Sequence, residues 1–115
     1  MKGLILITVL FSTFILTSIS SSGQKVFSCQ YIYEADVKVF VAKHTYEADL
    51  LVYKVDHSYE AGHNNGKWFF VEHNYEADKL IYFCDHEYEA DLVICFVEHS
   101  YEAKWREKEI KYIMY

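Results

Sequence analysis

The sequence predicts an all-β protein in which short strands alternate with short helical or 3-10 corners. Three observations predict this class. The tripeptide Tyr-Glu-Ala occurs six times at nearly constant spacing. Short runs rich in β-branched and aromatic residues fill the intervals, and polar, turn-like residues interrupt the chain too often for a helix of comparable length. The chain has no Pro and four Gly, so its corners need a structure other than the usual Pro-Gly turn.

The first 23 residues have the pattern of a secretion signal. Lys2 supplies a positive charge, and the apolar run Leu4 to Leu16 suits a signal peptide but is short for a bilayer-spanning helix. Ser21 and Gly23 are small residues at the positions that signal peptidase reads, so we expect cleavage between Gly23 and Gln24. A retained membrane anchor is the alternative. We therefore expect a secreted protein, extracellular or periplasmic, with no membrane attachment after the signal is removed.

The rest of the chain divides into a repeat domain at residues 24–106 and a C-terminal tail at residues 107–115. This length suffices for one small domain. Acidic residues outnumber basic ones by 17 to 11, and the basic residues are scattered except at 104–111, so nucleic acid is not an expected partner. The tail mixes charged and apolar side chains. It either docks on the core or meets an extracellular protein partner.

The repeat has a regular period. Tyr-Glu-Ala begins at Tyr33, Tyr46, Tyr59, Tyr75, Tyr88 and Tyr101. The intervals are 13 residues except for one of 16, so the chain consists of two triplets related by a shift of 42, with the extra residues in the loop 62–66. The third motif of each triplet is followed by Lys-Trp, at residues 67–68 and 104–105. A duplicated half is implied.

Strands are predicted between the motifs. Six mainly apolar residues follow Asp36, Asp49, Asp78 and Asp91. With residues 26–29 and 68–71, the same count gives about six strands. Apolar residues occupy both alternating sets, as Leu50, Leu51 and Val52 illustrate, so we expect most strands to be covered on both faces.

The motif itself is expected to form the corner. Capping-type residues precede Tyr at Thr45, Ser58, Asn74 and Ser100, which favours one short helical or 3-10 turn. The repeated Ala indicates a place where only a methyl group fits. The repeated Tyr indicates a ring that buries its face while its hydroxyl reaches a partner. Each Glu is expected to accept backbone N–H groups in its own turn.

These repeats resemble the septoil-knot family, small domains whose chain forms a seven-crossing, 7(1), knot. The resemblance covers Cys29 to Arg106 and rests on the two triplets, the Asp and strand after each motif, and the loop that leads into Gly66-Lys67-Trp68-Phe69-Phe70. It implies a knotted, pseudo-two-fold, β-rich domain. Family members often carry Ser-Gln-Ala where this chain has Tyr-Glu-Ala. The family brings no established activity, so it implies no catalytic or binding residue.

Five histidines share one repeat position, two residues before Tyr: His44, His57, His73, His86 and His99. Zinc needs imidazoles that converge on one ion, and this spacing does not supply that convergence or a close His-x-His pair. His63 lies outside the column, in a polar loop, where a solvated turn is the simpler interpretation. We predict no metal site and no cofactor. Metal binding by the histidine column is the alternative function.

The motif glutamates are six equivalents: Glu34, Glu47, Glu60, Glu76, Glu89 and Glu102. Acid and base catalysis needs two carboxylates in different environments, whereas a repeat makes the environments alike. The sequence also has no clear nucleophile–base pair or phosphate-binding loop. We therefore predict a non-enzymatic protein with a structural or binding role and no catalytic residue.

Cysteine usage does not indicate a disulfide scaffold. The chain has three cysteines, so Cys29, Cys84 and Cys95 can form at most one intrachain disulfide. All three lie in apolar, strand-like contexts. We expect small buried hydrophobic side chains.

N-terminal sequencing of the secreted protein tests the predicted export signal. The expected first residue is Gln24, because the small residues before it fit signal peptidase. Secreted material that begins at Met1 would contradict cleavage, since an intact hydrophobic run would keep the protein anchored.

Overall fold

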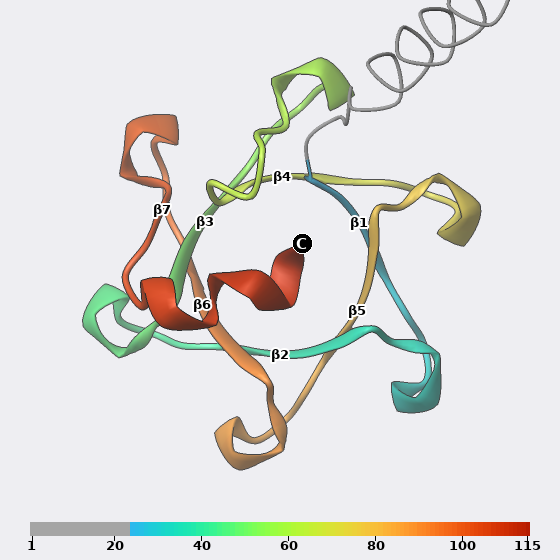
Figure 1. Cartoon of the computed structure of the whole chain (residues 1–115), viewed down its shortest axis with the longest axis horizontal. Coiled ribbons are helices and arrows are strands. Elements are labelled where there is room, and N and C mark those ends of the chain that lie inside the picture. Colours follow the sequence, from blue (N-terminus) through green and yellow to red (C-terminus); the bar gives the residue numbers. More distant parts are fainter. Residues whose placement is uncertain (1–23) are drawn as a thin grey trace, which may run out of the picture.

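The computed structural model describes residues 24–115, which form a closed barrel of six parallel strands with a seventh short strand attached (Figure 1). The predicted all-β class with 3-10 corners is confirmed. The expected signal peptide lies outside the described residues. Within residues 24–115, no helix combines the length and the hydropathy needed to cross a membrane.

Strands and 3-10 turns alternate along the whole described chain. The strands are β1 (Gln24–Ser28), β2 (Val37–Val41), β3 (Leu50–Lys54), β4 (Lys67–Phe70), β5 (Lys79–Phe83), β6 (Leu92–Phe96) and β7 (Lys104–Trp105). The turns are η2 (Ile32–Glu34), η3 (Thr45–Glu47), η4 (Ser58–Glu60), η5 (Asn74–Glu76), η6 (Glu87–Glu89) and η7 (Ser100–Glu102). A longer 3-10 helix, η8 (Lys108–Met114), ends the chain.

The strand order interleaves the two halves of the sequence. Around the barrel it runs β4-β1-β5-β2-β6-β3, and β3 pairs with β4 to close the ring. The chain therefore makes two circuits, and the strands of the second circuit fill the gaps left by the first. Adjacent parallel strands need a long crossover. The short segments here, such as residues 29–36, skip one position instead of joining neighbours, whereas the longer segment 55–66 joins the neighbouring strands β3 and β4.

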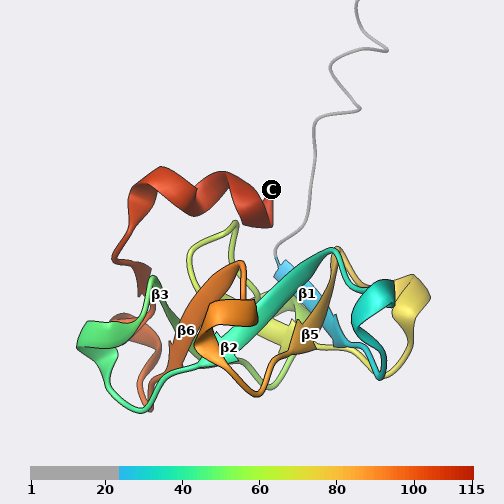
Figure 2. The same cartoon turned by 90° about the horizontal axis from the view of Figure 1, so that it is seen from below.

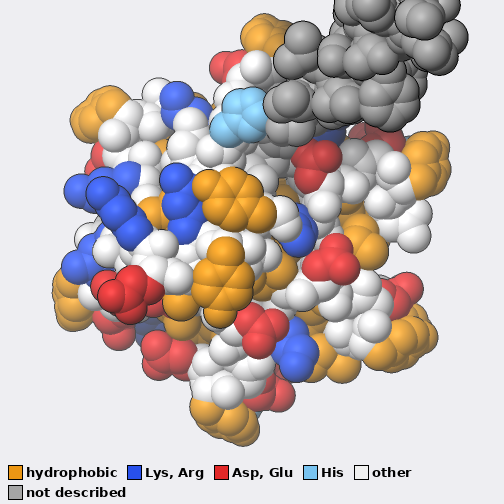
Figure 3. Space-filling model, in the orientation of Figure 1, with side chains coloured by type: hydrophobic (Ala, Val, Ile, Leu, Met, Phe, Trp, Pro, Cys, Tyr) orange, Lys and Arg blue, Asp and Glu red, His pale blue; other side chains and the backbone are white. Residues whose placement is uncertain are grey.

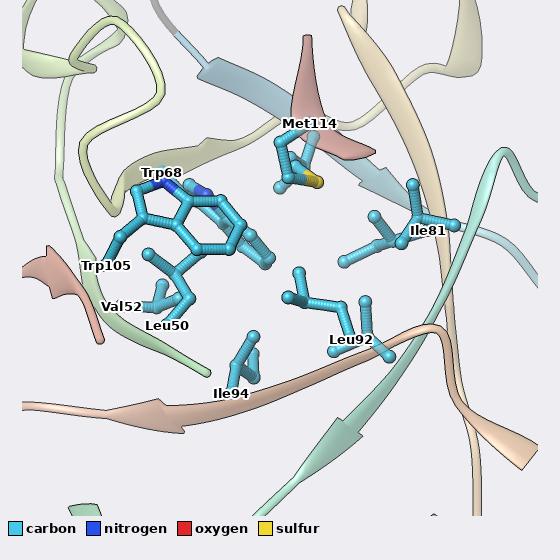
Figure 4. Packing of buried hydrophobic residues seen from close by; sticks show 11 residues of the cluster. Leu50, Val52, Trp68, Ile81, Leu92, Ile94, Trp105 and Met114 are labelled. Atoms are coloured by element: carbon cyan, nitrogen blue, oxygen red, sulfur yellow. The ribbon is translucent and has the colours of Figure 1, made fainter. Parts of the chain in front are cut away.

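Side chains on the inner face form the core. In β1 and β2, burial alternates along the strand, as expected when one face points into a barrel. The fully buried ring in the middle of the barrel consists of Val26, Val39, Val52, Trp68, Ile81 and Ile94, several of which point toward one another in Figure 4. These apolar side chains supply the main driving force for folding.

The outer face is less covered than the sequence predicts. Phe27, Phe40 and Tyr53 point outward and are half-buried, so the expectation of strands covered on both faces is wrong for most of the barrel. It holds at Leu51 and Cys95, which are 6 % exposed and pack together near the corner of η3. The corners project away from the barrel wall and leave much of it open (Figure 1).

The Asp after the motif fixes the register between neighbouring strands. Asp36 donates its backbone N–H to the carbonyl of Leu80 (2.7 Å), and its carboxylate accepts the N–H of Leu80 (3.0 Å). The same double contact occurs for Asp49 with Val93, Asp78 with Lys25, and Asp91 with Lys38. Each carboxylate thus satisfies a backbone donor at the beginning of the neighbouring strand.

The C-terminal tail closes one mouth of the barrel (Figure 2). Met114 of η8 is fully buried in the core, which agrees with docking of the tail on the barrel. Gln24 donates from Nε2 to the Met114 carbonyl (3.1 Å), and Asn64 donates from Nδ2 to the Lys111 carbonyl (2.9 Å). The backbone carbonyl of Asn64 also accepts a hydrogen bond from the Trp105 indole N–H (2.8 Å). The central loop and the tail therefore support each other.

Overpacking at Ala48 tests the prediction that the corner alanine has room only for a methyl group. Ala48 is 2 % exposed and packs with Leu51, Cys95 and Val97, while Ala90 is half-buried. Ala48→Leu is expected to lower the free energy of unfolding by about 1 to 3 kcal/mol, because extra methylenes strain a packed site. Ala90→Leu serves as the matched control with a smaller effect. Chemical denaturation gives both values, and equal effects below about 0.5 kcal/mol would contradict the packing.

Thiol labelling tests the burial of the cysteines. Cys29 and Cys95 are buried, Cys84 is half-buried, and all three are free. Burial, with nearby carboxylates as a lesser cause, raises the pKa of each thiol. Because the thiolate is the reactive form, native Cys29 and Cys95 should react with iodoacetamide at pH 8 far more slowly than in guanidinium, and Cys84 should react first.

The same shift predicts a loss of stability in alkaline solution. A raised pKa means that the folded state favours the protonated thiol, so this contribution is present at neutral pH and is lost as pH rises through the folded-state values. Fast labelling of native Cys29 or Cys95 by iodoacetamide at pH 8 would contradict the burial of these thiols, on which both predictions depend.

Candidate binding surface

Each of the six corners is a single 3-10 turn closed by local hydrogen bonds. In the first corner, the N–H of Glu34 donates to the carbonyl of Tyr31 (3.1 Å), and the N–H of Ala35 donates to that of Ile32 (3.2 Å). The residue before the turn is extended, with φ near −121° and ψ near 142° at Tyr31. The other corners repeat this pattern. The corner therefore needs neither Pro nor Gly.

The Glu carboxylate stabilises its own corner in three repeats. Glu34, Glu60 and Glu102 accept the backbone N–H of the residue three positions earlier, each at 3.1 Å. For these corners the expected role of the glutamates is confirmed. A carboxylate held in this way remains a charge on the surface of the molecule.

A pair of stacked aromatic rings caps every corner. His44 and Tyr46 have ring centroids 5.2 Å apart and planes that differ by 4°. The remaining histidine pairs are alike, with centroids 5.2 or 5.3 Å apart. In the first corner Tyr31 replaces the histidine and stacks on Tyr33 at 5.6 Å. An extended residue followed two positions later by the Tyr of the turn places both rings side by side.

The tyrosines of these pairs are exposed. Their exposed fractions are 81 % for Tyr33, 70 % for Tyr46, 82 % for Tyr59, 80 % for Tyr75, 84 % for Tyr88 and 82 % for Tyr101. The expectation that the Tyr ring buries its face is therefore wrong. The corner points away from the core, so the ring contacts its own histidine instead of the barrel. We call the six ring pairs the aromatic rim.

Acidic residues surround the aromatic rim. Every corner carries a Glu directly after its Tyr, and four corners also have an acid directly before the histidine: Asp56, Glu72, Asp85 and Glu98. Among all the acidic residues of the chain, Glu107 and Glu109 alone lie outside the corner segments. Figure 3 shows hydrophobic side chains at the outer tips with acidic side chains beside them, and most of the visible Lys and Arg side chains on the left part of this face. The rim is thus aromatic throughout and negatively charged except at the η3 corner, where Lys43 precedes the histidine and Arg106 donates to the backbone carbonyls.

The histidine column does not converge. Its five members lie on five different corners, which project outward from the barrel (Figure 1). His63 is exposed in the central loop. Residues 24–115 contain no group of three His, Cys, Asp or Glu side chains placed to hold a metal ion. Metal binding by the column stays a prediction without geometric support.

One signal in the sequence indicates the stacked pairs. Tyr31 occupies the position that is histidine in the other five repeats. Tyr and His share a planar ring and differ in their metal-binding chemistry, so the substitution favours a stacking role for the position. The pairing itself requires the extended backbone before each turn, which spacing alone does not reveal.

Comparison with known proteins identifies the domain. A family model described as the 7(1) septoil knot domain matches residues 23–106. Neither the curated proteins nor the solved structures include a significant match. The matched segment contains all six corners and the six barrel strands, while η8 lies beyond it. The chain therefore belongs to the septoil-knot domain family.

Proposed function

We propose that this is a secreted, non-enzymatic binding protein whose aromatic rim recognises cationic groups, such as Lys and Arg side chains, on an extracellular protein partner. The observation that carries the proposal is the set of six exposed Tyr rings, each beside carboxylates. The signal-like sequence at residues 1–23 supports the proposed location.

The chemistry of the rim suits a cation. The face of an aromatic ring attracts an ammonium or guanidinium group, with about 0.5 to 1 kcal/mol for each exposed contact. The histidine covers one face of the Tyr ring, and the exposed fractions above 70 % at five of the six corners leave the other face to a partner. The neighbouring carboxylates add attraction for the same charge and steer its approach.

The arrangement favours multivalent contact. Each corner offers a small area, so a single contact is weak. Several acidic corners on one barrel can engage a repetitive basic partner at several points, and linked contacts increase the overall affinity without any new interaction. A partner with one isolated charge would gain little.

Binding of an oligoarginine peptide tests this proposal. The purified protein should bind immobilised nona-arginine and should bind oligoglutamate much more weakly, with an affinity that falls as salt concentration rises. Replacing Tyr33, Tyr59 and Tyr88 by Ala should weaken binding by roughly tenfold to a hundredfold, from about 1.5 to 3 kcal/mol of lost cation–π contact.

Tyr112 provides the matched control. It is 69 % exposed on η8, away from the corners, so Tyr112→Ala should leave binding unchanged. Equal weakening by this control, or equal binding of oligoglutamate, would refute recognition by the rim. Circular dichroism should confirm that every variant remains folded, since exposed substitutions change stability by about 0.5 kcal/mol or less.

We further propose that the chain path is knotted, as the family description implies. The two interleaved circuits of the barrel support this proposal. Unfolding should be slow, because contacts between both circuits break before the chain can loosen. Refolding should be slower than that of an unknotted barrel of this size, because threading is added to loop closure. Denaturant-jump kinetics check both rates, and fast refolding in a single phase would contradict a threading step.

A further inference from the structure

We propose that the cavity between η8, β7 and the central loop binds a free phosphate-bearing anion, such as pyrophosphate or the phosphate ester of a small molecule. The cavity has a volume of about 370 Å³, near the lower end of the range for small-molecule sites. Lys104, Lys108 and Lys111 all line it, and Asn65 adds an amide from the central loop. Among the described residues, none that lines the cavity is acidic.

The lysines reach the cavity from two elements. Lys104 belongs to β7, whereas Lys108 and Lys111 are three residues apart in η8. A 3-10 helix has about three residues per turn, so side chains at this spacing lie on the same face of the helix. Met114 continues that face and is fully buried in the core. Two lysines therefore stand where docking of η8 alone would favour apolar residues, and both lie beyond the residues 23–106 that the family model matches.

The polar groups that a ligand needs are accessible. Lys104, Lys108 and Asn65 are exposed, and Lys111 is half-buried. The Oδ1 atom of Asn65 accepts the backbone N–H of Lys67 (3.2 Å), which leaves its Nδ2 group to donate to a ligand. Three ammonium groups and one amide can therefore donate hydrogen bonds into the cavity.

The buried floor of the cavity holds these groups in place. Asn64 and Trp105 line it and are only 2 % and 6 % exposed. The indole N–H of Trp105 donates to the backbone carbonyl of Asn64, and Nδ2 of Asn64 donates to the carbonyl of Lys111. The central loop, β7 and η8 are thus joined beneath the lysines, which reduces the cost of ordering the site when an anion binds.

The charge of this region is opposite to that of the whole chain. The chain has a net charge of −6, yet four basic residues lie within residues 104–111 against two acidic ones, Glu107 and Glu109, neither of which lines the cavity. Glu102 lines a neighbouring hollow, where its carboxylate accepts a backbone N–H at 3.1 Å. Like charges around one cavity repel each other and focus a positive field into it. A bound anion relieves that repulsion.

A compact, multiply charged oxyanion matches this set of donors. The Lys ammonium group is a point charge with three donors and a common partner of phosphate. A phosphate monoester carries about −1.5 to −2 charge at pH 7, so it attracts several ammonium groups more strongly than a carboxylate does. Cleavage before Gln24 would add an amino group beside the central loop, because the Gln24 N–H donates to the Gly62 carbonyl (2.8 Å). That charge is also positive and favours the same class of ligand.

Calorimetric titration and NMR with pyrophosphate test the proposal on the purified protein. We expect saturable binding of one pyrophosphate per chain at millimolar concentration or below, with shifts of the amide signals of residues 104–111 and of the Asn65 side chain. Binding should weaken as salt concentration rises. Acetate, which has a single charge, should bind at least about tenfold more weakly at the same ionic strength. Absence of saturable pyrophosphate binding, or shifts confined to other parts of the chain, would overturn the proposal.

A double variant, Lys104→Gln with Lys108→Gln, separates this site from general attraction between charges. Both side chains are exposed, so the variant should fold, and its affinity for pyrophosphate should fall at least about tenfold through loss of charge-assisted hydrogen bonds. Lys25→Gln with Lys38→Gln makes the same change of charge on the outer faces of β1 and β2 and should bind normally. Unchanged binding in the first variant, or an equal loss in the second, would refute the site.

Vesicles distinguish a free anion from a lipid headgroup. Pyrophosphate should bind without any lipid present, and it should compete with whatever attraction phosphatidic acid vesicles have for the same lysines. Capture of the protein by phosphatidic acid vesicles, without any binding of pyrophosphate, would contradict a site for the free anion.

Discussion

Every strand pairing of this domain joins the first half of the sequence to the second, and the rest of the structure depends on that constraint. Strands β1, β2 and β3 pair only with β4, β5, β6 and β7 among the described strands. Neither half can satisfy its own backbone hydrogen bonds through a sheet. The hydrophobic ring in the middle of the barrel likewise takes members from both halves. Folding therefore requires both circuits together, which favours one cooperative unit.

The same constraint places the aromatic rim. Because all consecutive barrel strands except β3 and β4 are separated by a strand of the other half, most corners extend outward before the chain returns to the barrel. This geometry exposes the Tyr rings and sets them on six separate tips. The mouth of the barrel has a different origin, since η8 covers it and is held there by hydrogen bonds from Gln24 and from Asn64 of the central loop. The rim follows from the repeat, whereas the cover over the mouth comes from the central loop and the tail, which lie outside the repeat.

Much of the secondary structure could be predicted from the sequence because both signals are local. The apolar runs indicate strands, and the Tyr-Glu-Ala motif with its capping residues indicates 3-10 corners. The order of the strands cannot be predicted from local signals. Near-identical repeats offer each strand several equivalent partners, and local pattern does not distinguish them. The proposed knotted path is not indicated by local pattern at all and follows only from the resemblance to the family.

The candidate site was harder to predict for a physical reason. Aromatic residues are usually buried, so a repeated Tyr indicates the core unless the direction of its corner is known. Tyr31 in the histidine column was the available clue to ring stacking. The register of β5 with β1 and β2 likewise depends on strands that are distant in the sequence. The acceptor role of Asp36 and its equivalents cannot be predicted from local sequence either, because their donors lie on strands distant in the sequence.

Separate expression of residues 24–65 and residues 66–115 tests the central claim most directly. Each half should be unfolded alone, with no cooperative unfolding transition and narrow amide dispersion by NMR, because each lacks the strands that it pairs with. The intact chain, measured under the same conditions, should be folded and cooperative. A half that folds alone, with dispersed amide signals and a cooperative transition, would contradict the interleaved barrel.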